Sequence, residues 1–513
     1  MIELEGPEKR GEVGKGKFYI TTAIDYVNAP PHLGHLYEKL CADVLARFHR
    51  LKGEDVFFLT GTDENASKNE KAAKEAGISV KEFVDRNAQK FIELCRVFNI
   101  SNDDFIRTTE ERHKRVAQLV FKKLFDKGDI YKGVYEGFYC VGCEEFKTKK
   151  DLVDGKCPEH GEVEWIKEEN YFFRASKYEK QILELIEKRD FIIPKRWRNE
   201  ILQRLRENGL KDISISRKGV GWGIVTPIDK EHRIYVWIDA LVNYISALGY
   251  PDGELYKKFW PADVHLIGKG VNWFHSVIWP ALLLALGVEL PKVILVHGYI
   301  TLEGEKLSKS KGKVVDPFEL AQKYQIDAIR YYLLKEVPFG GDGDFSEKRL
   351  IEKVNNELVA NLGNFIHRTL SFVWKEFNGE VPKPGKFDKG DEEFITLFKE
   401  VEEEVGRKLE NFEIDEAFKE VLEFSSSCNQ YFQNKEPWRT KDKNCIYLCV
   451  NAVRSLAILM EPFLPSSAEK VWEILNLPGS VHEQEWGSIS ELLFKGGEKI
   501  RKPEIIFKKI LKE

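Results

Sequence analysis

The chain has 513 residues, of which 42% are hydrophobic and 32% are charged, and its formal net charge at pH 7 is −5. This length allows two to four domains around a large core, and the slightly acidic balance excludes a protein that coats nucleic acid indiscriminately. No continuous apolar run is long enough to predict a membrane span, and the charged N-terminus does not resemble a secretory signal, so we expect a cytoplasmic protein.

The first hundred residues alternate between predicted strands and helices. Phe18–Ile24 and Asp55–Glu64 are apolar runs typical of buried strands, and a helix is predicted from about His35 to Lys52. This alternation predicts a parallel, doubly wound α/β sheet. Such sheets bind ligands at the carboxyl ends of their strands, where the segments PPHLGH (Pro30–His35) and GTDE (Gly61–Glu64) both stand.

The α/β pattern stops at about Tyr131 and resumes at about Ile234. Between these positions, short strands, turns and a cluster of cysteines predict an inserted unit. After about Leu350, apolar residues recur at three- and four-residue spacing as far as about Leu475, which predicts an all-helical bundle.

The cysteines fall into two groups. Cys140, Cys143, Cys157 and His160 form two tight pairs, which predict a tetrahedral zinc knuckle with a structural role because no ligand position remains for water. The alternative is a set of unrelated buried cysteines. The remaining cysteines lie in apolar helical patterns and are predicted to be core thiols: Cys41, Cys95, Cys428, Cys445 and Cys449.

A glycine- and lysine-rich segment, Gly304–Gly312 (GEKLSKSKG), has the composition of a mobile basic loop. Such a loop is able to close on a polyphosphate and neutralise charge that develops during nucleotidyl transfer. Taken alone, a Lys/Ser run of this kind is more often a solvated surface loop, and it becomes specific only with a partner motif upstream in an α/β domain.

His32 and His35 stand at the predicted strand–loop–helix junction, with Gly34 between them. Helix N-termini favour phosphate, imidazoles donate hydrogen bonds without a fixed charge, and Gly34 allows close approach of a nucleotide to the backbone. A metal site would need a third ligand, and packed core histidines remain an alternative for either residue taken singly.

Together, HLGH and the downstream KLSKS resemble the signature pair of class I aminoacyl-tRNA synthetases, which are built on a Rossmann-type fold. The segments ITTAIDYVNAPPHLGH, FLTGTDE, YCVGCEEF, GLKDISISR, YVWIDALVNYISAL, GKGVNWFHSVIWPALL and HGYITLEGEKLSKSKG resemble the methionyl-tRNA synthetase family across nearly the whole chain. The resemblance implies two halves of a Rossmann-type catalytic domain (1–130 and 233–300), a zinc-knuckle insertion (131–232), a KLSKS and stem-contact region (301–350) and a helical anticodon-binding domain (351–513).

The activity implied is ATP-dependent ligation of L-methionine to tRNA(Met) through methionyl-adenylate, with release of AMP and pyrophosphate and with Mg²⁺ bound to ATP. The resemblance assigns catalysis to His32, His35, Lys306 and Lys309, and adds Gly34 and Ser308 to the ATP contacts. The methionine-binding residues that it implies are Ile24, Tyr26, Asp63, Trp237, Ala240, Leu241, Tyr244, Phe274 and His275. A flexible thioether suits an aromatic-lined slot, and Asp63 would hold the ammonium group; the alternative for the aromatic residues is ordinary core packing.

In the helical region, the resemblance implies that Arg368 and Trp438 bind the anticodon, with a base stacked on Trp438. The alternative for Trp438 is a helix-packing residue. The basic stretch Pro194–Arg206 is either a solvated helix face or a phosphate contact.

Some positions depart from the family pattern: Gly270 lacks an expected carboxylate, Asp25 replaces an apolar or aromatic residue, Asn65-Ala66 replaces His-Gly, and Ala360 replaces an asparagine. Two other functions stay open, namely a class I synthetase for another amino acid and a tRNA- or RNA-binding paralogue that does not charge. We expect a monomer or a chain paired with a separate tRNA-binding subunit, and no membrane partner.

Overall fold

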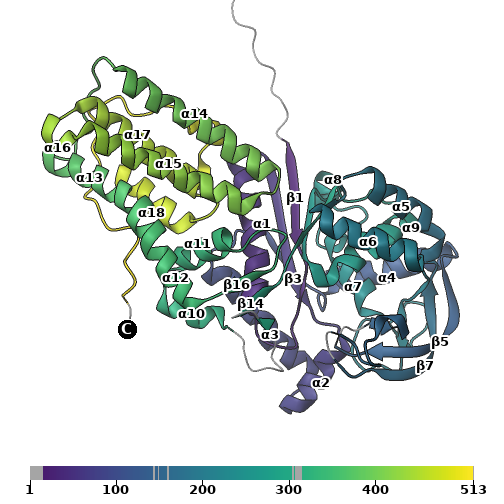
Figure 1. Cartoon of the computed structure of the whole chain (residues 1–513). Helices are drawn as coiled ribbons and strands as arrows, with labels where there is room; N and C mark the ends of the chain where they lie inside the picture. The colour runs from purple at the N-terminus through teal and green to yellow at the C-terminus, as the bar shows by residue number, and fades with distance from the viewer. Residues whose placement is uncertain are drawn as a thin grey trace, which may run out of the picture.

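A computed structural model describes residues 16–142, 145–147, 149–158, 161–302, 305–306 and 315–511. In Figure 1 a central sheet separates a helical domain on one side from an α/β region and its insertion on the other. The prediction of a parallel α/β catalytic part followed by an all-helical part is confirmed.

The central sheet is parallel throughout, with the strand order β2-β3-β1-β12-β13-β8 and with β4 on the outer side of β3. Its strands are β1 (Lys17–Thr22), β2 (Asp25–Tyr26), β3 (Asp55–Asp63), β4 (Asp104–Arg107), β8 (Ile192–Ile193), β12 (Val264–Gly268) and β13 (Val293–His297). The chain leaves β1 toward β3 but later returns on the other side through β12. The carboxyl ends of β1 and β12 therefore form a topological switch point, where open α/β sheets bind ligands.

Helices cover both faces of this sheet. On one face, α1 (Leu33–Leu51) belongs to the same apolar core as the helical domain. The helices of the other face share a second core. Beyond α1, the catalytic part contains the helices α2 (Ser67–Ala76), α3 (Val80–Val97), α4 (Glu111–Asp126), α7 (Val236–Ser246), α8 (Glu254–Phe259), the π-helical turn Phe274–Ile278 and α9 (Trp279–Leu286).

The insertion is a small antiparallel sheet with two helices. Its strand order is β6-β5-β7-β9, and β5 and β7 pair over ten residues each. The elements are β5 (Ile130–Cys140), β6 (Glu145–Lys147), β7 (Glu164–Phe173), α5 (Glu179–Lys188), α6 (Lys195–Asn208) and β9 (Ile213–Ser214), followed by the hairpin β10 (Ser216–Lys218) and β11 (His232–Ile234).

A second small sheet and the helical domain complete the chain. Strands β14 (Ile300–Leu302), β15 (Glu305–Lys306) and β16 (Gly343–Phe345) accompany α10 (Pro317–Lys323), α11 (Ile326–Glu336) and α12 (Glu347–Lys353). The helical domain contains a π-helical segment (Val354–Gly363), α13 (Asn364–Glu376), α14 (Lys389–Glu410), α15 (Ile414–Lys435), α16 (Pro437–Thr440), α17 (Lys443–Met460) and α18 (Pro465–Leu475).

Helix α17 is the one helix in the described ranges that is long and apolar enough to cross a membrane, and 89% of it is buried within the fold. It packs against α13, α14, α15 and α18 as the central helix of the domain. Its apolar character is therefore explained by its place in the core. The five cysteines predicted to be core thiols are all buried, which confirms that prediction.

Buried charges join the catalytic part to the helical domain. Asp43 and Arg47, one turn apart on α1, form an ion pair of 2.9 Å, and Arg330 of α11 reaches the same Asp43 carboxylate at 2.8 Å. Arg47 also pairs with Glu461 at 2.7 Å, just beyond α17. Burial alone would raise the pKa of Asp43, but the two guanidinium groups lower it to about 2.

Candidate functional site

The two histidines of HLGH cap the first turn of α1. His32 is the N-cap residue, and its Nδ1 accepts a hydrogen bond from the backbone N–H of Gly34 at 3.0 Å, while Nδ1 of His35 accepts from the backbone N–H of His32 at 3.1 Å. The rings stack with 3.7 Å between centroids. Because each Nδ1 is an acceptor, each neutral ring carries its hydrogen on Nε2. The capping thus fixes the tautomer of both histidines.

Gly34 is required by the ring of His32. A Cβ atom at this position would lie 2.9 Å from Cε1 and 3.1 Å from Nδ1 of that ring. Any other residue would therefore push His32 out of its capping position. The sequence analysis explained this glycine by the approach of a nucleotide, and the structure adds a reason within the chain itself.

A buried ion pair lies beneath His35. Lys39, one turn further along α1 and fully buried, pairs with Asp25 of β2. Burial opposes the charge of Lys39, but the Asp25 carboxylate raises its pKa above the ordinary value. The other oxygen of Asp25 lies 3.9 Å from Nε2 of His35. Lys39 thus accounts for the carboxylate at position 25, where an apolar or aromatic residue was expected.

Three aromatic rings predicted to bind methionine lie together. Trp237 of α7 stacks on Phe274 with 3.9 Å between ring centroids and 5° between the planes. Tyr26 meets Trp237 edge-on at 6.0 Å. Ile24, Tyr26 and Leu241 belong to the same apolar cluster, and Ala240 is the neighbour of Leu241 in α7. Phe274 begins a π-helical turn, a feature that often marks functional sites.

The other two members of the predicted pocket, Tyr244 and His275, bond to each other. Nδ1 of His275 lies 2.9 Å from the carbonyl oxygen of Val271, and Nε2 lies 2.7 Å from the hydroxyl of Tyr244. A carbonyl only accepts, so Nδ1 donates and Nε2 accepts from Tyr244. Burial lowers the pKa of His275 to about 4, so its imidazole is neutral at physiological pH.

Asp63 is 2% exposed at the carboxyl end of β3, paired in register with Tyr26 of β2. The structure therefore places a carboxylate beside the aromatic group. Asn65, two residues further on, is one of the positions that differ from the family pattern. Its side chain donates to Asp239 at 2.8 Å and to the carbonyl of Thr108 at 3.1 Å. This side chain connects β3 to α7 within the catalytic part, and Ala66 beside it is fully buried.

The surroundings of Gly270 leave no room for a side chain. A Cβ atom there would lie 2.4 Å from the hydroxyl of Tyr299. The preceding Lys269 pairs with Asp342 at 2.7 Å, and Asp342 also accepts the backbone N–H of Tyr299 at 2.8 Å. A carboxylate therefore does lie beside the GKG segment, but it comes from the loop before β16.

The basic loop is described only at its base. The backbone of Lys306 pairs with Thr301 in the β14–β15 hairpin, just after the carboxyl end of β13. The loop thus leaves the sheet at the edge that carries the two histidines. Ser308 and Lys309 lie outside the described residues, as does the side chain of Lys306.

Two of the four predicted zinc ligands are described. Cys140 ends β5 and Cys157 is bridged to Gly161, and both thiols are buried. Cys143 and His160 lie outside the described residues. No group of three potential metal ligands occurs in the ranges that are described. Buried thiols at two turns have the donor chemistry that Zn²⁺ prefers.

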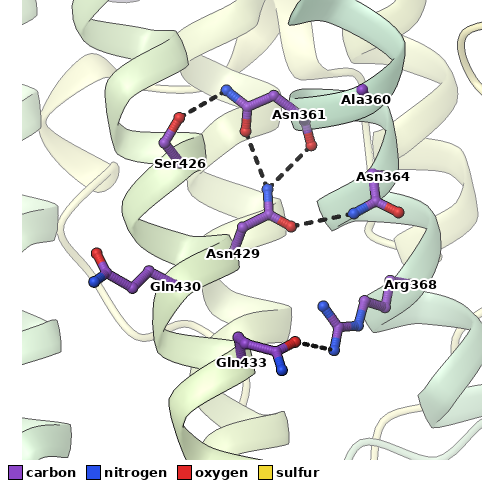
Figure 2. Close-up of a pocket in the computed structure, with 8 residues that line it drawn as sticks. All are labelled: Ala360, Asn361, Asn364, Arg368, Ser426, Asn429, Gln430 and Gln433. Carbon is purple, nitrogen blue, oxygen red and sulfur yellow. Dashed lines mark hydrogen bonds between the residues drawn. The ribbon is translucent and has the colours of Figure 1, made fainter. Parts of the chain in front are cut away.

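The helical domain contains a polar hollow of about 420 Å³, shown in Figure 2. Asn361 bonds to Asn429 and Ser426, with Nδ2–Oδ1 and Nδ2–Oγ distances of 3.0 and 2.9 Å. Asn364 bonds to the other end of the Asn429 amide at 3.4 Å. The amides come from the π-helical segment, α13 and α15. Ala360 lines the hollow without a polar group, and its neighbour Asn361 supplies the amide.

Arg368 and Trp438 lie together at one end of this hollow. The Arg368 guanidinium lies 4.3 Å from the ring centroid of Phe432 and 4.9 Å from that of Trp438, and it donates to Gln433 at 3.0 Å. Trp438 is 37% exposed. The structure therefore leaves part of the indole ring open to a stacking partner beside a cation.

Comparison with known proteins agrees with this arrangement. Residues 18–164 and 150–370 match the family described as tRNA synthetases class I (M), and residues 391–512 match the anticodon-binding domain of tRNA ligase. The methionine–tRNA ligase of Caldanaerobacter subterraneus is 44% identical over 97% of this chain and 79% of its own length. The chain belongs to the methionyl-tRNA synthetase family. The Rickettsia felis member is 43% identical over 96% of this chain and 98% of its own.

A solved member of the methionyl-tRNA synthetase family has the same fold. The Mycobacterium tuberculosis methionyl-tRNA synthetase, determined with methionyl-adenylate, is 37% identical, has a TM-score of 0.92, and covers 96% of this chain and 99% of its own. Several residues of the site were not found from sequence: Lys39 and the amides of Asn429 and Gln433. Their partners are distant along the chain or joined by backbone geometry, and no local motif marks them.

Proposed function

We propose that the chain ligates L-methionine to tRNA(Met), using ATP and a methionyl-adenylate intermediate, and that the predicted site residues carry this reaction. The observation that carries the proposal is the position of an imidazole-capped helix N-terminus at the same sheet edge as an aromatic cluster with a neutral histidine. The first feature suits phosphate and the second suits a thioether side chain.

In the first half-reaction, the methionine carboxylate attacks the α-phosphate of ATP and pyrophosphate leaves. The Nε2–H groups of His32 and His35, whose Nδ1 atoms are engaged in capping, donate to phosphate oxygens without adding a fixed charge. Lys306 and Lys309 neutralise the charge on the leaving pyrophosphate, with Gly34 and Ser308 as further ATP contacts. Mg²⁺ bound with ATP supplies additional neutralisation of charge.

Selection of methionine depends on an apolar pocket that also contains a hydrogen-bonded polar pair. Trp237, Phe274 and Tyr26 surround the thioether, and Ile24, Ala240 and Leu241 fill the remaining wall. Tyr244 and His275 form a neutral hydrogen-bonded pair, which avoids a buried charge beside the sulfur. Asp63 holds the ammonium group of the substrate.

The insertion is stabilised by one structural Zn²⁺ held by Cys140, Cys143, Cys157 and His160. The support is the burial of the Cys140 and Cys157 thiols at two turns of a sheet with a small core. We expect one zinc per chain, and Cys157→Ser should lower the content well below one. A stoichiometry near zero in the purified wild-type protein would refute this assignment.

The helical domain binds the anticodon through Arg368 and Trp438, whose exposed ring next to a guanidinium is the supporting feature. We further propose the division of the chain into a split catalytic domain (1–130 and 233–300), the insertion (131–232), a stem-contact region (301–350) and the anticodon-binding domain (351–513). The enzyme acts in the cytoplasm, as a monomer or with a separate tRNA-binding subunit.

Methionine-dependent exchange of pyrophosphate into ATP tests the proposed function. Exchange should be stimulated by methionine far more than by leucine, isoleucine, valine or cysteine, and charging of tRNA(Met) should follow. Lys309→Ala should raise the activation free energy of exchange by about 2–4 kcal/mol, on the scale of one lost transition-state donor. The Kd for methionine should stay nearly unchanged. Preference for another amino acid, or exchange without charging, would contradict the proposal.

A further inference from the structure

A buried polar network that the proposed mechanism does not use lies on the catalytic part, around α7. Its centre is the carboxylate of Asp239 in α7, and its other members are His113 of α4 and Asn65 of the turn after β3. Asp239 and His113 are fully buried, and Asn65 is 8% exposed. Burial of polar side chains is costly unless they find hydrogen-bond partners, so the contacts within the network decide what it contributes.

The two oxygens of the Asp239 carboxylate accept from two different elements. Nε2 of His113 lies 2.6 Å from Oδ1, and this nitrogen donates because a carboxylate only accepts. Nδ2 of Asn65 donates to Oδ2 at 2.8 Å and also to the carbonyl oxygen of Thr108 at 3.1 Å. The carboxylate thus joins α4, α7 and the turn after β3 at one point.

His113 contacts α7 at two positions on one face of the helix. Its Nδ1 lies 2.8 Å from the hydroxyl of Ser246, two turns after Asp239. Successive residues of a helix are about 100° apart, so Trp237, two positions before Asp239, stands about 160° around the helix from that face. The two contacts therefore fix the rotation of α7 about its axis, and with it the direction of the Trp237 ring.

The same carboxylate holds the turn that carries Asp63. Asn65 follows Asp63 by two residues, and the residue between them is Glu64. The backbone N–H of Glu64 donates to the hydroxyl of Thr108 at 2.9 Å, and its carbonyl accepts from the indole N–H of Trp222 at 2.7 Å. Because this backbone is held on both sides, a displacement of Asn65 is passed to Asp63 rather than absorbed by the turn.

We propose that Asp239 is a positioning residue that sets the distance between the two ends of the methionine site. This inference rests on the proposed function. Through Asn65 the carboxylate fixes the turn whose Asp63 holds the ammonium group, and through α7 it fixes the Trp237 ring beside the thioether. Packing alone does not require a carboxylate here, because apolar side chains of similar volume stabilise a core as well or better. A fixed distance selects for side-chain length, and one methylene in a fitted pocket is worth about 10- to 200-fold in kcat/KM.

Asp239→Asn tests the inference, because it keeps the size of the side chain but turns an N–H group toward one of the two donors. In pyrophosphate exchange it should lose about tenfold to a hundredfold in kcat/KM for methionine, mainly through KM, the scale of one lost hydrogen bond to a charged group. The KM for ATP should stay within about twofold of wild type. The ratio of kcat/KM for methionine to that for ethionine, which is one methylene longer, should fall at least about threefold. A burst assay of adenylate formation counts the active sites and corrects every rate for the folded fraction.

Two further variants separate positioning from loss of structure. Val242→Ala is the matched control, because Val242 is fully buried on the same helix: it should lower the free energy of unfolding but keep the KM for methionine and the methionine-to-ethionine ratio. Asn65→Leu removes the donor at the edge of the network and should repeat the effects of Asp239→Asn, so the test does not depend on how well the first variant folds. The double variant should lose less than the product of the two single losses, because the new amide no longer faces the Asn65 donor.

The inference would be overturned by a methionine KM and a methionine-to-ethionine ratio that stay at wild-type values in Asp239→Asn and Asn65→Leu. Losses that multiply in the double variant, or a ratio lowered equally by Val242→Ala, would overturn it as well. Absence of methionine-dependent exchange in the wild-type enzyme would instead overturn the proposed function.

Discussion

Replacing His32 separates its two roles, as helix cap and as phosphate donor. His32→Ala removes the acceptor for the Gly34 N–H and the Nε2–H that faces away from it. Loss of an N-cap costs about 0.5–2 kcal/mol, and loss of one preorganised transition-state donor costs about 2.7–4 kcal/mol in activation. The variant should therefore populate the locally opened first turn of α1 roughly 2- to 30-fold more than wild type. Its pyrophosphate exchange rate should fall about 10²- to 10³-fold.

His32→Asn is the informative companion, because asparagine is a favourable N-cap residue but does not reproduce the Nε2–H donor. Hydrogen–deuterium exchange of the peptide that covers the first turn of α1 should return close to wild type, while pyrophosphate exchange stays low. A fast enzyme with asparagine at this position would show that His32 acts only as a cap. Equal amide protection in wild type and His32→Ala would show that the capping box contributes nothing in solution.

Other predictions concern stability, pH and tRNA. Lys39→Met leaves Asp25 buried without its partner and should cost about 3–5 kcal/mol in denaturant unfolding; Asp25→Asn added to it should recover much of this loss, and simple additivity would contradict the pairing. In the folded protein the pKa of His275 is about 4, which is below its value in the unfolded chain. Between these two values the unfolded chain binds a proton that the folded protein does not bind. The free energy of unfolding should therefore fall by up to about 3 kcal/mol as the pH drops from 6.5 to 4. The slope should flatten in His275→Gln, and an unchanged slope would refute the assignment. Trp438→Ala should weaken binding of tRNA(Met) by about 1–3 kcal/mol while methionine-dependent exchange, the internal control, stays constant; an unchanged Kd for tRNA would remove the stacking role.

The fold was predictable because its signals are local. Apolar strands followed by helices specify a parallel sheet, and the carboxyl ends of those strands specify where His32 and Asp63 lie. The mutual capping of His32 and His35 was not predictable, because it depends on the extended backbone of His32, with φ −133° and ψ 177°. A sequence pattern gives no such angle.

Contacts between segments that are distant along the chain were also not predictable from the sequence. Lys39 follows Glu38 in a helix with many charged residues, and sequence alone suggests a solvent-exposed side chain. Only the position of β2 shows that Asp25 neutralises it. The amides of Asn361 and Asn429 are 68 residues apart along the chain, and their hydrogen bond requires the packing of α15 beside the π-helical segment.

The buried ion pairs on α1 have a consequence for dissecting the protein. Cutting the chain between its catalytic and helical parts would leave Asp43 and Arg47 on one fragment without Glu461, and would deprive Arg330 of the carbonyl oxygens of Pro462 and Phe463, at 3.2 and 2.8 Å. Each lost partner leaves a desolvated charge, and a broken buried pair costs about 3–5 kcal/mol, a large fraction of the stability of a typical domain. The helix that presents HLGH therefore cannot be expected to keep its position in an isolated catalytic fragment, and residual activity in such a fragment would measure damage to α1 as well as the absence of an anticodon contact.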